Sequence, residues 1–144
     1  MTDGQDGRDG RESPAMAALR SAVGWRGPAR IDTVERRHLH SYQDAIGAAR
    51  SDEAPLTFAA CFLREPPDCP PALRYGTGWL NGEDAFEGHR PVRVGAVLHS
   101  APRLTDVAEK RGRSGTFALL TFVTDFTDEH GGLLVRHTGV RLRR

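Results

Sequence analysis

The stretch Ser41–Leu63, SYQDAIGAARSDEAPLTFAACFL, decides the fold of this chain. Its second half, Pro55–Leu63, is apolar on every side, which is typical of a strand or helix with protein packed all round it. Its first half ends a predicted helix at Gly47, because glycine is a common residue just past a helix end. Between the two halves lies a short polar loop, Ala48–Glu53. A polar loop beside an apolar core is where a small enzyme would place its catalytic groups.

Two helices are predicted around this loop. The first covers residues 33–46, and Asp32 with Glu35 gives it a start that resembles a capping box. The second begins near Asp52 and ends before Pro66-Pro67. Helical spacing predicts one buried stripe on the first helix, formed by Val34, His38, Tyr42, Ala45 and Ile46.

After residue 75 the pattern changes from helical to extended. Strands are predicted at 82–94, 97–107, 116–127 and 133–142, with a further short strand at 27–31. The stretch 116–127 has apolar residues on both faces, which indicates a central strand covered on both sides. Helices followed by an antiparallel meander predict an α+β fold.

The composition excludes several classes of protein. The chain of 144 residues suits one domain with a substantial core, and its formal net charge of +1 indicates no strongly charged partner. The arginines are scattered rather than striped with aromatic residues, so we expect no nucleic-acid binding. Cys61 and Cys69 give neither a disulfide framework nor a zinc site. We expect Cys61 in the core and Cys69 in a loop.

The termini and the hydropathy predict a chain that does not enter a membrane. No apolar stretch approaches the ~20 residues that span a bilayer, and residues 1–13 lack the apolar segment of a signal peptide. We therefore expect a cytoplasmic protein. Residues 1–24 are predicted to be a disordered tail with little to bury, and residues 25–144 a single domain.

Four stretches together resemble a known family. They are APLTFAACF (54–62), LNGEDAFEGHRPVRVG (80–95), EKRGRSG (109–115) before a long strand, and DEHGGLLVRHTGVRLRR (128–144). In this order they are similar to the FAS1-like dehydratase domain, the N-terminal type of the MaoC-like (R)-specific enoyl hydratases and dehydratases. The resemblance covers residues 27–144 and implies a hot-dog fold, in which an antiparallel sheet wraps around a central buried helix. It also implies that an acyl thioester of coenzyme A or acyl carrier protein is hydrated or dehydrated between its α and β carbons.

Active members of this family use an Asp and a His in a D-x-N-P-x-H motif just after the first helix. Aligned without gaps, the motif falls on residues 48–53, so Ala48 occupies the Asp position and Glu53 the His position. The usual dyad is absent. Two interpretations of the catalytic candidates Asp52 and Glu53 stay open: they cap the buried helix, or one of them substitutes as the general base.

The family suggests a third interpretation. Some members pair as unlike subunits, and the subunit without the dyad shapes the acyl tunnel while the other carries the chemistry. The chain resembles the subunit without the dyad, so we expect a homodimer or a heterodimer with a second MaoC-like subunit. We expect no cofactor and no metal, because no phosphate-binding loop or metal-ligand spacing occurs.

The resemblance also suggests residues that bind the substrate. These candidates are Pro55, Thr57, Phe58, Tyr75, Trp79, Asn81 and Gly82. Tyr75 and Trp79 either line an acyl tunnel or pack the proline-rich connector at residues 65–75. Asn81 either orients the thioester or occupies a turn. His137, in the last strand, is expected to be exposed.

A basic turn is a candidate docking site. Lys110, Arg111 and Arg113 form either a solvated hairpin or a contact for the phosphates of coenzyme A or an acidic carrier protein.

Two other functions suit the same fold. One is a thioesterase or an enzyme of conjugate addition to enoyl thioesters, which release of a free thiol would distinguish. The other is a non-enzymatic acyl-binding or assembly subunit, which would copurify with a second MaoC-like chain and show no turnover alone.

Overall fold

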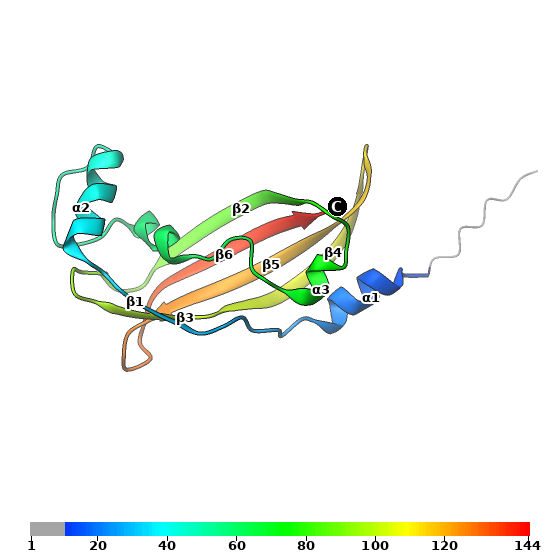
Figure 1. Cartoon of the computed structure of the whole chain (residues 1–144), viewed down its shortest axis with the longest axis horizontal. Coiled ribbons are helices and arrows are strands. Elements are labelled where there is room, and N and C mark those ends of the chain that lie inside the picture. Colours follow the sequence, from blue (N-terminus) through cyan, green and yellow to red (C-terminus); the bar gives the residue numbers. More distant parts are fainter. Residues whose placement is uncertain (1–10) are drawn as a thin grey trace, which may run out of the picture.

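The structure, a computed structural model, describes residues 11–144. Six strands form one antiparallel sheet in this range: β1 Arg30–Thr33, β2 Trp79–Gly88, β3 Val97–Ser100, β4 Pro102–Gly112, β5 Gly115–Thr127 and β6 Leu133–Arg143. Their order is β1-β3-β5-β6-β2, and β4 continues beside β5 where β3 ends. Figure 1 shows helix α2 (Arg36–Ala45) at one end of this sheet and helices α1 (Pro14–Ser21) and α3 (Pro70–Leu73) at the other.

The central position predicted for residues 116–127 is confirmed by β5. This strand pairs with β3 and β4 on one side and with β6 on the other. Leu120, Phe122 and Phe126 are fully buried on one face, which we call the covered face. On the opposite face Phe117 and Leu119 are only half-buried, so only one face of β5 is fully covered, contrary to the prediction.

Proline and glycine residues mark where several of the other strands begin or end. A single strand was expected at residues 97–107, but the chain divides into β3 and β4 at Ala101, directly before Pro102, which has no backbone N–H. β2 starts at Trp79 and stops at Gly88, before Pro91, so the predicted strand at 82–94 is shifted toward the N-terminus. β6 confirms the last predicted strand and extends it to Arg143.

Gly82 marks an irregularity in β2 that requires glycine. The register between β2 and β6 shifts between Asn81 and Glu83. A Cβ atom at Gly82 would lie 2.8 Å from Leu142 Cδ1 and 3.0 Å from the carbonyl oxygen of Val140. Glycine at this position therefore lets β2 approach β6 through a bulge.

The first predicted helix is confirmed as α2, with a different buried face. Its N-cap is Glu35, which makes no side-chain capping bond, and the residues it buries are Leu39 and Gln43. His38 and Ile46 of the expected stripe are exposed. The apolar face is narrow because α2 lies at the end of the sheet and not across it.

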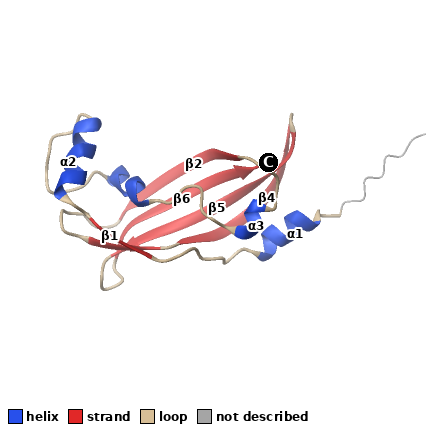
Figure 2. Cartoon of the chain, viewed as in Figure 1, coloured by secondary structure: helices blue, strands red, loops and turns tan. Residues whose placement is uncertain are grey.

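The stretch 55–63 is not the long buried helix that was expected. It forms a 3₁₀ helix, η1 (Leu56–Phe62), of seven residues. Only Phe58, Ala59 and Phe62 are buried, whereas Ala60 and Cys61 are exposed. Figure 2 shows η1 as a short element over one end of the sheet. Pro55 precedes the helix and Pro66-Pro67 follow it closely, which leaves no room for a longer one.

Part of the predicted N-terminal tail is ordered. Residues 1–10 lie outside the described range, but α1 caps its first turn with the Ser13 hydroxyl and buries Met16 and Leu19 completely. Full burial of such side chains stabilises a fold by about 1.5–3 kcal/mol each. Cys69 lies in a loop as expected, directly before α3, and is fully buried beside α1, whereas Cys61, expected in the core, is exposed.

Two separate apolar clusters fill the covered face. One surrounds α1, α3 and the middle of β5, and the other surrounds α2, η1 and the end of β5. Buried polar residues lie between them on the same face, among them Ser100, Thr124, His137 and Arg141. No helix in the described range is long and apolar enough to cross a bilayer.

Candidate functional site

The loop at residues 48–53 is held by a buried side chain that sequence reasoning missed. Gln43 of α2, only 1% exposed, donates from Nε2 to the carbonyl oxygens of Ser51 (3.3 Å) and Glu53 (3.2 Å). Its Oε1 accepts from the backbone N–H of Ser51 at 3.3 Å. A glutamine in a helix is usually exposed, so only its place on the buried side of α2 distinguishes Gln43.

The two predicted catalytic carboxylates both pair with arginine. Arg36 of α2 donates to both oxygens of Asp52, and Glu53 Oε2 lies 3.2 Å from Arg93 Nη2. The hydrogen bond from Arg36 lowers the pKa of the Asp52 carboxyl below its ordinary value. The side chains of Asp52 and Glu53 are 58% and 51% exposed.

The positions of Asp52 and Glu53 show whether these carboxylates cap η1. Neither residue lies in the first turn of η1, which begins after Pro55 and has no side-chain cap. Instead the backbone of Asp52 and Ala54 pairs with that of Val94 and Val92, at 2.9 and 2.8 Å. The loop is therefore fixed by backbone bonds and ion pairs. The lowered pKa keeps Asp52 ionised and makes it a weaker base than a carboxylate whose pKa lies near the working pH.

An apolar cavity of about 340 Å³ opens beside this loop. Glu53, Pro55 and Phe58 line it from one side, and Phe126 and Val135 of the covered face form its floor. The chain between β2 and β3 closes it with Gly88, His89, Arg90, Pro91 and Val92. Of the residues predicted to bind substrate, Pro55 and Phe58 therefore meet here. We call this space the first cavity.

The other residues predicted to bind substrate lie outside the first cavity. The Thr57 hydroxyl pairs with Tyr42 of α2 at 2.6 Å. Trp79, Asn81 and Gly82 lie at the start of β2, whereas the cavity reaches Gly88 at its end, about 20–30 Å further along the strand.

Tyr75 and Trp79 instead serve packing at the other end of the sheet. The Tyr75 hydroxyl donates to Glu109 at 2.9 Å, and burial together with this bond raises the pKa of Tyr75 to about 12. Arg143 lies over the Trp79 ring at 5.0 Å and donates to the carbonyl oxygens of Ala72 and Gly76. This agrees with the alternative in which these rings pack the connector.

The basic turn also lies far from the first cavity. Lys110, Arg111 and Arg113 are exposed at the hairpin between β4 and β5, whereas the cavity touches β5 at Phe126. The two places are separated by most of the length of a strand of 13 residues.

A second cavity of about 300 Å³ lies over the covered face between β1 and the connector. Trp25, Leu63 and Pro67 line it from the loops, and Ser100 and Thr124 from the sheet. Phe62 lines this cavity and the first one.

A buried ionic cluster next to these cavities was not predicted. His137 is 1% exposed, not exposed as expected, and its Nε2 lies 2.7 Å from Asp84 Oδ1. Arg141 donates to the same oxygen at 2.5 Å and to Glu65 Oε2 at 2.9 Å. Burial opposes ionisation of Asp84, but the hydrogen bonds from Arg141 and His137 prevail, so its pKa is lowered. His137 Nδ1 is buried with no partner in the described residues.

The sequence carried one signal for this cluster. His137, Gly139, Arg141 and Arg143 occupy every second position of β6, and all of them point to the covered face. Among residues 11–144 no three His, Cys, Asp or Glu side chains group closely enough to hold a metal ion.

Comparison with known families identifies the chain. A family model described as "FAS1-like, dehydratase domain region" matches residues 21–137. The chain belongs to this family. The resemblance found in the sequence is thereby confirmed, and the FAS1-like dehydratase match includes the loop at 48–53 and both cavities.

Solved structures similar to this FAS1-like dehydratase chain share its fold. The HadBC (3R-hydroxyacyl-ACP dehydratase) complex from Mycobacterium tuberculosis is 19% identical, with a TM-score of 0.67, over 84% of this chain and 96% of that one. The ChsH1-ChsH2 complex from the same organism is 14% identical, with a TM-score of 0.67, over 90% and 88%. An (R)-hydratase from A. caviae is 16% identical, with a TM-score of 0.58, over 85% and 96%. These similarities establish the hot-dog fold. Comparison with curated sequences gives no significant match.

Proposed function

We propose that this chain binds the acyl group of a coenzyme A or carrier-protein thioester and serves hydration or dehydration at its β carbon. It does so beside a second MaoC-like subunit that carries the catalytic Asp and His. The observation that carries the proposal is the first cavity, an apolar space beside a loop in which Ala48 and Glu53 replace the usual catalysts. The carboxylates that remain in that loop are exposed and paired with arginine.

The relatives support an acyl thioester and a second subunit. The HadBC complex is a 3R-hydroxyacyl-ACP dehydratase, and ChsH1-ChsH2 is also a complex. The reaction needs a base or acid near the β carbon and donors for the thioester oxygen, which becomes enolate-like in the transition state. The first cavity offers apolar walls and neither of these groups in a buried position.

The sheet supplies a surface for a second subunit. Among the described strands β2 is the last on its side of the sheet, so the outer edge of this ten-residue strand has no strand partner there. Such an edge is a template for pairing with another strand. Gly88, where this edge ends, lines the first cavity, so a subunit docked along β2 would lie next to the bound acyl chain.

Reconstitution tests the proposal. The chain alone, a MaoC-like subunit with an intact D-x-N-P-x-H motif alone, and an equimolar mixture are each given an enoyl-CoA, and loss of the enoyl-thioester absorbance is followed. We expect no enzymatic turnover by the chain alone and at least a tenfold higher rate in the mixture than in the second subunit alone. Enzymatic turnover by the chain alone would contradict the proposal that a second subunit carries the catalytic residues.

Three variants separate acyl binding from catalysis by this chain. Asp52→Ala and Glu53→Ala should leave the rate of the mixture within about twofold, because these groups are exposed and ion-paired. Phe58→Ala, which removes a wall of the first cavity, should raise KM. Loss of turnover in either carboxylate variant would favour the altered-site interpretation.

A further inference from the structure

The sheet carries apolar side chains on the side opposite the covered face. We call this side of β2, β4, β5 and β6 the outer face. Its exposed or half-buried apolar residues are Leu80, Ala85, Ala108, Phe117, Leu119, Val140 and Leu142. None of these residues belongs to either apolar cluster. A contiguous apolar patch of this kind marks a surface that binds another protein.

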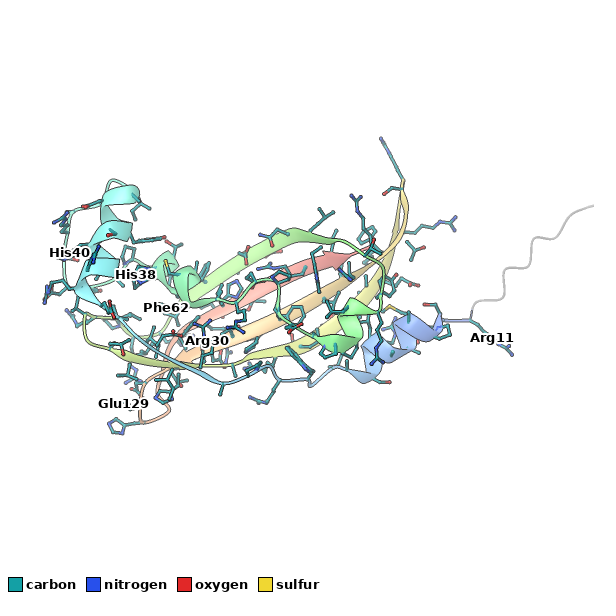
Figure 3. All side chains as sticks on the ribbon, in the orientation of Figure 1. Arg11, Arg30, His38, His40, Phe62 and Glu129 are labelled. Atoms are coloured by element: carbon teal, nitrogen blue, oxygen red, sulfur yellow. The ribbon has the colours of Figure 1, made fainter. Side chains whose placement is uncertain are left out.

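The helices pack on the other side of the sheet. α1, α2, α3 and η1 each contribute residues to the two clusters of the covered face. Figure 3 shows Phe62 of η1 next to His38 of α2, and their ring centroids are 5.6 Å apart. Because these helices lie on the covered side, they leave the outer face open to a partner.

One apolar row crosses all four strands of the outer face. It consists of the direct cross-strand partners Ala108, Leu119, Leu142 and Leu80. The strands follow the order β4-β5-β6-β2. A twofold axis parallel to the strands, between β5 and β6, therefore lays this row on the same row of a second copy. Leu142 of one copy then lies on Leu119 of the other, and Leu80 on Ala108.

The same axis brings opposite charges together. Pairing across β5 and β6 places Arg103 of β4 level with Ala85 of β2. The axis lays Arg103 of one copy over Ala85 of the other, between two exposed carboxylates. These are Glu83 and Glu87, each about 7 Å along the strand from Ala85. Because the axis is twofold, the interface contains this arrangement twice.

The outer face is large enough for a stable pair. Four strands of about ten residues, about 4.8 Å apart, cover roughly 600 Å² in plan. The relief of the side chains raises the accessible area above this value. A standard protein interface buries about 800 Å² of accessible surface on each partner.

We propose that the outer face binds the outer face of a second copy of this chain, about a twofold axis parallel to the strands between β5 and β6. The two sheets then stack about 10 Å apart, as in a β-sandwich. This interface goes beyond the proposed function, because the second MaoC-like subunit is placed at the edge of β2 and not on a face of the sheet. A pair of chains therefore keeps both β2 edges available.

Sedimentation equilibrium of the full chain, without any acyl ligand, tests the interface. We expect a mass of twice the 15.8 kDa of one chain. Leu80→Glu should raise the Kd of the pair at least about tenfold, because it brings a charge into the apolar row. Leu73→Glu in α3 is the matched control, since Leu73 is 47% exposed and Leu80 43%, and it should leave Kd within about twofold. A single-chain mass at about 100 μM wild-type protein, or an equal effect of the two variants, overturns the proposal.

Charge reversal tests the orientation of the two copies. Arg103→Glu alone and Glu83→Arg/Glu87→Arg alone each place like charges opposite one another, so each should raise Kd at least about tenfold. An equal mixture of the two variants should recover the wild-type Kd within about threefold, because both contacts of the mixed pair then join opposite charges.

A control covers poor folding of the first variant. If Arg103→Glu does not fold, Arg103→Gln is mixed in its place and should still bind Glu83→Arg/Glu87→Arg more tightly than that variant binds itself. A mixture of folded variants that gains no affinity overturns the proposed twofold arrangement. The turnover measured by reconstitution does not depend on this result, so a failure here is distinguishable from a failure of the proposed function.

Discussion

His137 and Arg141 occupy positions of β6 where the alternation of the strand places apolar side chains. Both point to the covered face and are 1% and 3% exposed. Two carboxylates, Asp84 and Glu65, offset the charge of Arg141, and Asp84 also pairs with His137 Nε2. Burial of charge is tolerated only with such partners, and the removal of one partner leaves the others uncompensated. Each residue of this cluster therefore depends on the rest.

Asp84→Asn tests that dependence. The amide keeps the shape of the carboxylate but loses its charge, so Arg141 retains only Glu65 as an ionic partner. We expect the free energy of unfolding to fall by about 2 kcal/mol, measured by urea denaturation. Asp44→Asn is the control, because Asp44 pairs with Arg50 on the surface and its loss should change stability by less than about 0.5 kcal/mol. Equal effects of the two variants would contradict the account of the cluster.

Tyr75 predicts the response to alkaline pH. The pKa of Tyr75 is raised to about 12 in the folded protein, above its ordinary value of 10.0, so the neutral phenol is favoured in the folded state. This contribution to stability is complete below pH 10 and is lost as the pH rises to about 12. We expect Tyr75→Phe to flatten the fall in stability across this range. Tyrosinate absorbance of the two proteins gives the check, and a Tyr75 that ionises at its ordinary pKa would contradict the prediction.

At the scale of elements, η1 shows where a hydrophobicity pattern fails. The run at 55–63 predicts burial on all sides, but a helix of seven residues at one end of a sheet buries only one face. Spacing within the run carried the better signal, since the buried residues Ala59 and Phe62 are three residues apart and share a face of the 3₁₀ helix. The prolines on either side of η1 limit the length of this helix, and the apolar content of the run gives no information about that length.

Two neighbouring alanines of η1 test its one-sided burial. Ala59 is 6% exposed, and Ala60 is exposed. Ala59→Asp should destabilise the chain by about 3 kcal/mol, because it buries a charge without a partner. Ala60→Asp should change stability by less than about 0.5 kcal/mol. Thermal unfolding of both variants measures the difference. A large loss of stability in Ala60→Asp would contradict the one-sided burial of η1 and support a helix that is buried on all sides.

The strands were more predictable than the helices. β5 and β6 combine alternation with long runs of β-branched and aromatic residues, which suit a half-buried pleated surface. The division between β3 and β4 at Ala101 was not foreseen, although Pro102 removes a donor there. α1 was missed because Met16 and Leu19 are the only two large apolar residues in a short, alanine-rich stretch. Their burial depends on Cys69, Ala72 and Leu104, which are distant in sequence.

At the scale of the whole molecule, the residues proposed from the family divide between the two ends of the sheet. Glu53, Pro55 and Phe58 meet at the first cavity because they are close in sequence. Its far wall, Gly88 to Val92, and its floor on β5 and β6 come from remote parts of the chain, and no local pattern joins them. The sequence therefore predicted one wall of the site.

The place of the basic turn leads to a prediction about charge. Serine at positions 110, 111 and 113 should leave the affinity for acyl-CoA within about twofold, because most of the length of β5 separates the turn from the first cavity. Arg90→Ser, at the wall of that cavity, should weaken binding more. Calorimetric titration with octanoyl-CoA compares the two. A larger loss in the triple variant would support docking of the ligand phosphates at the turn.

The division of the covered face into two apolar clusters has a consequence for cooperativity. The clusters share no residue, and the strands β2, β5 and β6 run through both ends of the molecule. Hydrogen exchange should therefore show three levels of protection: the amides of β5 and β6 exchange last, and the α1–α3 end and the α2–η1 end each open on their own. The α2–η1 end can then open locally when an acyl group binds, while the α1–α3 end stays folded and keeps the strands of the sheet in register.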